Sequence, residues 1–139
     1  MQPLHPKKAW VVSVNLGYGH ERAAFGLADL AEGKIITANH YSGIPKEEKQ
    51  LWLRTQKLYE TVSRLQPLPL IGKAIFGAMD HFQEIDAFYP RRDLRKANLQ
   101  LHEMQYLVEH RGLGKHLIQS LTKRDLPFIS TFFLPAFAA

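Results

Sequence analysis

Two closely spaced glycines and a histidine near the start of the chain are the residues best suited to chemistry. The segment VNLGYGHERAAF places Gly17, Gly19 and His20 between a valine-rich run and an alanine-rich stretch with helical spacing. Glycines at such a turn permit positive φ and a close approach of the backbone to a ligand. A helix start favours neutral imidazole over imidazolium, and a neutral imidazole facing a ligand can remove a proton from a hydroxyl group. We therefore predict a ligand site at this turn, with His20 as its base.

The spacing around the glycines excludes two nucleotide-binding motifs. A dinucleotide fingerprint needs a third glycine where Arg22 stands, and an acid at the end of the next strand, where Asn39 and His40 stand. A P-loop needs a lysine directly after the second glycine, where His20 stands. One alternative stays open: a tight turn that uses glycine for geometry alone, with His20 as a polar residue that merely starts the helix.

Apolar patterning predicts the elements that position this turn. Short apolar runs predict strands over residues 9–16, 34–40 and 128–134. Helical spacing predicts helices over residues 20–31, 46–65, 71–89, 97–110 and 112–124. We expect one more strand inside the helix-rich middle, around residues 68–71 or 107–108. Strands separated by helices favour a parallel sheet with helices on both faces, so the predicted class is α/β.

Composition limits the class of protein. The chain of 139 residues fits one domain, and its 45% hydrophobic and 22% charged residues exclude wholesale disorder. A net charge of +5 permits a nucleic acid, an anionic membrane or a phosphorylated ligand as partner. The absence of cysteine excludes disulfides and thiolate metal sites. The chain has no signal-peptide pattern and no apolar stretch of spanning length, so we expect a cytoplasmic protein.

Metal and nucleic-acid sites are not predicted. His81 and Glu84 form an H-x-x-E pattern that lacks the second histidine of a zinc helix, and we predict no metal and no cofactor. The basic cluster RRDLRK over residues 91–96 stands outside any recognisable nucleic-acid-binding module, so we predict no nucleic-acid partner.

The segment VNLGYGHERAAFGLADL resembles the first strand–loop–helix unit of two-domain GT-B glycosyltransferases. The likeness is greatest to monogalactosyldiacylglycerol synthases and to the transferase that makes the lipid-linked peptidoglycan precursor. The matching residues are Gly17, Gly19, His20 and the pair Ala23 and Ala24. RDLPFISTFFLPAF is similar to a late strand of these enzymes that carries a threonine, here Thr131. Tyr18 departs from the small residue common there, and no acid follows Thr131.

The resemblance implies a Rossmann-like, acceptor-side N-terminal half of a GT-B enzyme over residues 1–139. The donor-binding C-terminal half would lie outside this chain, which ends in the apolar segment FLPAFAA and which we expect to be truncated and inactive alone. A hydroxyl acceptor, lipid-linked in the relatives named, would attack a nucleotide sugar while His20 takes its proton. The backbone of Gly17, Tyr18 and Gly19, with Arg22, would lie near phosphate or sugar.

Two further groups of residues are candidates for contact with a ligand or with a membrane. His40 and Tyr41 follow the second predicted strand and would face the ligand with Thr131, although a hydrogen-bonding turn is the alternative for this pair. A peripheral contact with the inner face of the plasma membrane is expected from apolar and basic residues of the middle segment, and packing in the core is the alternative. These membrane candidates are Ile71, Ile75, Phe76, Met79, Phe82, Arg91 and Arg92.

Overall fold

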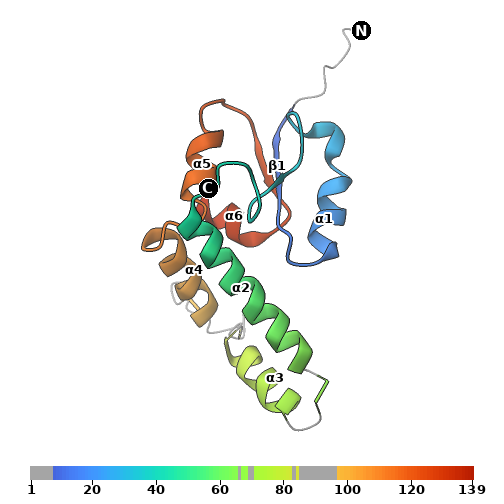
Figure 1. Ribbon diagram of the computed structural model, residues 1–139, viewed down its shortest axis with the longest axis vertical. Coiled ribbons are helices and arrows are strands. Elements are labelled where there is room, and N and C mark those ends of the chain that lie inside the picture. The colour runs from blue at the N-terminus through green and yellow to red at the C-terminus, as the bar shows by residue number, and fades with distance from the viewer. Residues whose placement is uncertain (1–7, 66, 69–70, 83, 85–96) are drawn as a thin grey trace, which may run out of the picture.

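The valine-rich run near the start of the chain forms the central strand of a small parallel sheet. The computed structural model describes residues 8–65, 67–68, 71–82, 84 and 97–139. Strands β1 (Trp10–Ser13), β2 (Ile36–Thr37) and β3 (Phe128–Ser130) lie in the order β2-β1-β3, and both pairings are parallel (Figure 1). Strands therefore form at the three predicted places, and each is shorter than predicted.

The side chains of β1 alternate between two buried faces of the sheet. Val12 and Val14 belong to a core with residues of α2, α4, α5 and α6, whereas Val11 packs with Ala24 and Ala31 on the other side. All three valines are fully buried, as expected for the central strand of a parallel sheet covered on both faces. The predicted α/β class with flanking helices is confirmed.

The predicted helix over residues 20–31 consists of two shorter pieces. Helix α1 (Tyr18–Phe25) starts earlier than predicted and ends before Gly26, and a 3-10 turn, η1 (Ala28–Leu30), follows it. Gly33 has a φ of 78°, and a glycine supplies that left-handed conformation without strain. Its turn leads the chain back to β2.

The middle of the chain forms a helical arm that extends away from the sheet (Figure 1). Helix α2 (Lys46–Leu65) has 20 residues, which corresponds to a length of about 30 Å. Helix α3 (Ile71–Phe82) packs against α2, and helices α4 (Leu99–Glu109) and α5 (Lys115–Leu121) lead back to β3. Arg91 and Arg92 lie outside the described residues. No helix in the described part of the chain is both long and apolar enough to cross a membrane.

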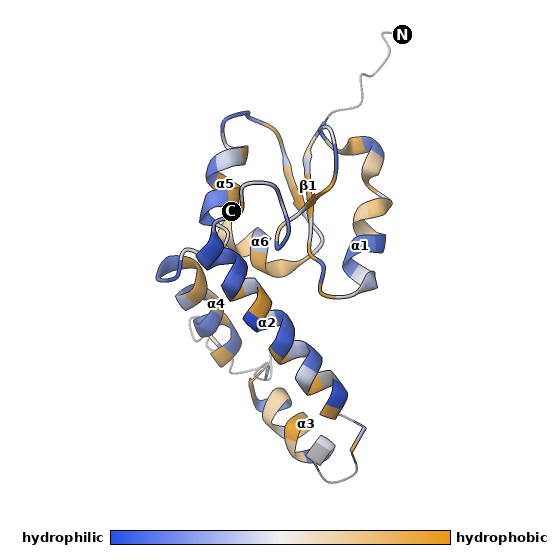
Figure 2. Ribbon diagram, in the orientation of Figure 1, coloured by the Kyte–Doolittle hydropathy of each residue, from blue (hydrophilic) through white to orange (hydrophobic). Residues whose placement is uncertain are grey.

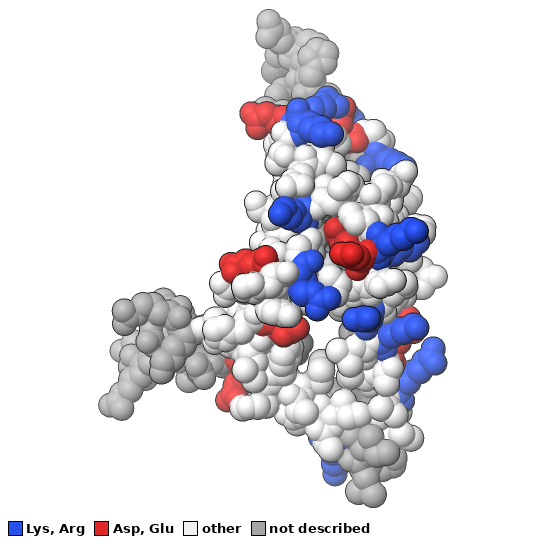
Figure 3. Space-filling model, turned by 60° about the vertical axis from the view of Figure 1, so that its left-hand side comes forward, with Lys and Arg blue, Asp and Glu red and all other residues white. Residues whose placement is uncertain are grey.

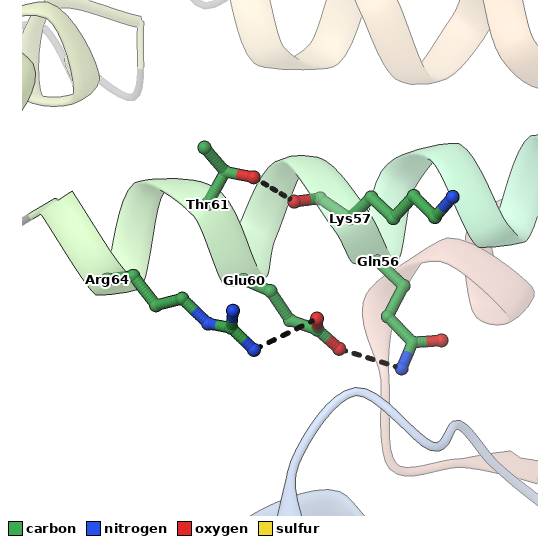
Figure 4. Close-up of polar contacts among 5 residues, drawn as sticks. All are labelled: Gln56, Lys57, Glu60, Thr61 and Arg64. Atoms are coloured by element: carbon green, nitrogen blue, oxygen red, sulfur yellow. Dashed lines mark hydrogen bonds and ion pairs between the residues drawn. The ribbon is translucent and has the colours of Figure 1, made fainter.

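Helix α2 has a polar face and an apolar face along its outer half. On the polar face the amide of Gln56 donates a hydrogen bond to Glu60 (3.1 Å), and Arg64 forms an ion pair with the same carboxylate (4.0 Å; Figure 4). These residues follow one another at intervals of four and so lie on one side of the helix. Leu58 and Val62 lie on the opposite side, where α3 packs.

A further strand was predicted around residues 68–71 or 107–108. The second place was wrong, because residues 107–108 belong to α4, and the first falls partly outside the described residues. The strand predicted over residues 128–134 ends at Ser130, and helix α6 (Phe133–Ala138) follows it. The Ser130 hydroxyl donates a hydrogen bond to Phe132 O (2.7 Å), which turns the chain, and Pro135 is acceptable in the first turn of the new helix.

Candidate functional site

Two residues predicted to share a site, His20 and Thr131, are hydrogen-bonded although 111 residues separate them. His20 lies in the first turn of α1, and Thr131 directly follows β3. The imidazole Nδ1 is 2.9 Å from Thr131 O. Because β1 and β3 are parallel, the turns that leave their carboxyl ends meet at one edge of the sheet, where ligands commonly bind in open parallel sheets. We call this the His20 edge.

The contact with Thr131 fixes which nitrogen of His20 can act as a base. A backbone carbonyl oxygen only accepts hydrogen bonds, so Nδ1 must carry the proton that it donates to Thr131 O. In the neutral imidazole the lone pair then lies on Nε2. The ring also lies edge-on against Phe132, with the ring centroids 4.8 Å apart. The imidazole is thus oriented by a second group, an arrangement that catalytic histidines also require.

The hydroxyl of Thr131 joins the two turns a second time. Its Oγ1 donates a hydrogen bond to His20 O (3.0 Å) and lies 3.3 Å from the buried hydroxyl of Ser13 at the end of β1. Thr131 N–H also donates to Val12 O (3.0 Å), which continues the ladder between the strands. His20 is thus held at two points, its backbone carbonyl and its imidazole ring.

Asn39 connects the turn after β2 to the turn after β1. Its side-chain oxygen accepts a hydrogen bond from Asn15 N (2.9 Å), and its side-chain nitrogen donates to Asn15 O (3.1 Å). Only 9% of Asn39 is exposed, so this pair of bonds satisfies an amide that would otherwise be costly to bury. In the sequence, Asn39 was notable only because it stands where a dinucleotide site would need an acid. Its position at the end of a predicted strand was the one signal that it could join two turns.

The glycine turn itself is open. Gly17 precedes α1 with a φ of 139°, which non-glycine residues rarely adopt, and no atom lies within 4 Å of the position where a Cβ would be. Gly19 lies inside α1 and has no positive φ, so its conformation does not require glycine. Tyr18 is 82% exposed, and Arg22 is exposed on α1. The backbone of the turn at Gly17 is therefore uncovered, and an exposed cation follows on the next turn of α1.

His40 and Tyr41 belong to a different cluster, beside α5. The Tyr41 hydroxyl is 2.7 Å from His116 Nδ1, and the two rings are stacked. The buried carboxylate of Glu48 accepts a hydrogen bond from Gly114 N (3.1 Å), directly before α5. Burial, with the negative charge of Glu48, raises the pKa of Tyr41, so its hydroxyl stays protonated at neutral pH. Sequence analysis missed Glu48 and His116, because neither lies in a motif.

The same burial acts on Glu48. Loss of water around the carboxylate raises its pKa, against the opposing effects of the Gly114 N–H and of His116. The carboxylate holds the first turn of α2 to the start of α5. We assign it a structural role, since its hydrogen bond joins two backbone segments.

Four membrane candidates of α3, namely Ile75, Phe76, Met79 and Phe82, lie along an apolar groove against the outer half of α2. The side chain of Ile71, the fifth, lies outside the part of the chain that the structure describes. Phe76 is 49% exposed, and Ile75, Met79 and Phe82 are half-buried. With α2 and one residue of α4 they enclose a volume of about 380 Å³. Figure 2 shows that the ribbon of α3 is largely apolar. The groove is lined by Thr55, Leu58, Tyr59, Val62, Ile75, Phe76, Met79, Asp80, Phe82 and Gln100.

Within the described ranges no three histidine, aspartate or glutamate side chains are grouped as metal ligands would be. No protein-family model matches the chain, and no curated protein and no solved structure matches it either. The chemistry of the His20 edge is therefore inferred from its own geometry.

Proposed function

We propose that this chain is the acceptor-side half of a GT-B glycosyltransferase that transfers a sugar from a nucleotide-sugar donor to a hydroxyl acceptor. The observation that carries the proposal is the hydrogen bond from His20 Nδ1 to Thr131 O, which leaves Nε2 as a base at the carboxyl edge of a parallel sheet. The open glycine turn beside it offers backbone amides to a phosphate or a sugar. A second half of the enzyme would bind most of the donor.

In the proposed reaction His20 acts on the acceptor. Its Nε2 takes the proton of the acceptor hydroxyl while the hydroxyl oxygen forms a bond to the anomeric carbon of the donor. The bond from that carbon to the phosphate oxygen breaks, and its electron pair leaves with the nucleoside diphosphate. Arg22 is the nearest cation along the chain on the helix that follows the turn, and we assign it to the charge of the leaving diphosphate.

The first test is a transfer assay with the full-length protein that contains this chain. We expect radiolabelled sugar to pass from a nucleotide sugar to a hydroxyl lipid, with release of one nucleoside diphosphate for each sugar. The 139-residue chain alone should be inactive, because the proposed donor-binding half would lie outside it. Tight binding of a phosphorylated compound at the His20 edge without turnover by the full-length protein would contradict the proposal. Such binding would favour a second candidate function, that of a non-catalytic α/β module that binds a phosphorylated small molecule.

We also propose that the enzyme works as a peripheral protein on the cytoplasmic face of the plasma membrane. The apolar groove of the helical arm, with Leu58 and Phe76 67% and 49% exposed, supports this contact. On the face drawn in Figure 3, basic side chains are spread along the molecule among acidic ones. We therefore expect apolar burial to contribute more than local positive charge.

Vesicle sedimentation tests this contact. Replacing Leu58 and Phe76 together by serine should lower the fraction bound to anionic vesicles at least about tenfold, because each apolar side chain contributes about 1.5–3 kcal/mol when fully buried. The control is Phe25→Ser, a side chain that is 77% exposed on α1 and remote from the arm. Equal binding of the wild-type and the doubly substituted protein would contradict a role of the helical arm in membrane binding.

A further inference from the structure

We propose a second ligand site, separate from the His20 edge, that takes a small phosphate monoester in a cleft between β2 and α5. The cleft has a volume of about 300 Å³ and shares no lining residue with the hydrogen-bonded contacts of His20. Its wall comes from the segment 34–37, the turn after β2, and three residues of α5. They are Lys34, Ile35, Ile36, Thr37, His40, Tyr41, Ser42, Leu117, Ser120 and Leu121.

The side chains that line the cleft favour an anion. They include the cation of Lys34, the imidazole of His40 and the hydroxyls of Thr37 and Ser42, and none of the ten lining residues is acidic. The Ser120 hydroxyl donates a hydrogen bond to Leu117 O (2.7 Å), so toward a ligand it can only accept. Lysine and hydroxyl donors are typical partners of a phosphate group, and charge-assisted hydrogen bonds are stronger than neutral ones. A cation would find no carboxylate among these residues.

The backbone of β2 adds a donor on the same side. Ala38 N–H donates to Ser13 O (2.7 Å), toward the centre of the sheet. Successive residues of a strand point their N–H and C=O groups to opposite sides, so those of Thr37 point away from β1. The hydrogen bond from His40 N to Thr37 O (2.9 Å) agrees with this direction. Since β2 is an edge strand of the described sheet and Thr37 lines the cleft, we infer that its outward-pointing amide is available to a ligand there.

The rest of the wall sets the class of ligand. Leu117 and Leu121 of α5 are buried at 2% and 8% exposure, and they give the cleft an apolar side. Tyr41 is fixed there by its hydrogen bond to His116 (2.7 Å) and by stacking on the same ring. A ligand with an anionic head and a small apolar or ring-shaped body would contact both the polar groups and the leucine side of the cleft. A free phosphate ion would contact only the polar groups. Small-molecule sites commonly combine apolar walls with a few polar groups in this way.

NMR titration of the full chain with phenyl phosphate tests the site, with inorganic phosphate and phenol as matched probes. We expect saturable shifts of the amides of Thr37, His40 and Ser120 with phenyl phosphate, weaker ones with inorganic phosphate and none with phenol. Replacing Lys34 and His40 together by alanine should raise the dissociation constant at least about tenfold, the loss expected for charge-assisted hydrogen bonds. The control pair is Lys49→Ala with His102→Ala, which removes the same groups at exposed positions elsewhere.

Three results would overturn the site. They are an unchanged dissociation constant after the Lys34 and His40 substitutions, shifts that follow exposed lysines over the whole surface, and equal shifts with phenol. Because Lys34 and His40 are exposed, their replacement should leave the unfolding midpoint unchanged, and circular dichroism checks this. The outcome is independent of sugar transfer, since none of the substituted residues lies at the His20 edge.

Discussion

Replacing His20 by alanine in the full-length protein should reduce kcat for sugar transfer about a hundredfold or more, the usual effect of losing a general base. KM for the acceptor should change little, because Nε2 is assigned to proton removal rather than to binding. Initial rates over a range of acceptor concentrations, with saturating donor, measure both effects.

His102→Ala is the matched control for this substitution. His102 is an exposed histidine on α4, so its removal changes composition identically without touching the His20 edge. The lost contact with Thr131 O is also expected to lower the free energy of unfolding by about 1 kcal/mol, so activity must be compared where both variants are folded. Turnover close to wild type in folded His20→Ala protein would remove His20 from the chemistry.

Gly114→Ala should lower the free energy of unfolding by about 2–5 kcal/mol. Gly114 has a φ of 82°, a left-handed conformation that costs an L-residue about 1–2 kcal/mol. A Cβ placed there would lie 2.8 Å from Ala138 Cβ in α6, and overpacking of this kind costs about 1–3 kcal/mol. The backbone cannot move away freely, because Gly114 N donates to the buried carboxylate of Glu48 (3.1 Å). Urea unfolding followed by circular dichroism measures the loss.

Gly112→Ala separates the two causes. Gly112 also has a left-handed φ, 66°, but no atom lies within 4 Å of its Cβ position. Replacing Gly112 should therefore lower the free energy of unfolding only by the cost of the left-handed conformation, about 1–2 kcal/mol. If both substitutions lower the free energy of unfolding equally, α6 moves to make room for the new methyl group. The close contact with Ala138 then does not destabilise the protein.

The sheet and its glycine turn were predictable because their signals are local. The β-branched run of β1 and the positive φ of Gly17 follow from the residues themselves. The parallel direction of the strands followed from their alternation with helices, whereas the central position of β1 was not predicted. The end of β3 was not predictable, since a short apolar run is compatible with a strand or with a buried helix. Packing of Leu134 in the core selects the helix.

The contacts that organise the two candidate sites were hidden for a different reason. Asn39 reaches Asn15, and Glu48 reaches Gly114, across 24 and 66 residues of sequence. A single polar residue contributes nothing to periodicity, and its partner is set only after the helices have packed. The placement of Thr131 beside His20 was expected from a family resemblance, whereas its hydrogen bonds emerge only from the folded chain.

The central position of β1 has a consequence for the order in which the chain is made. Ser13 and Thr131, whose hydroxyls are 3.3 Å apart, are separated by 118 residues, so a ribosome completes β1 long before its partner β3 exists. At synthesis rates of about 5–20 residues per second, the most apolar strand waits roughly 10 seconds for that neighbour. During this interval β2 is the one partner of β1 within the described sheet, and the other edge of β1 remains open to other chains.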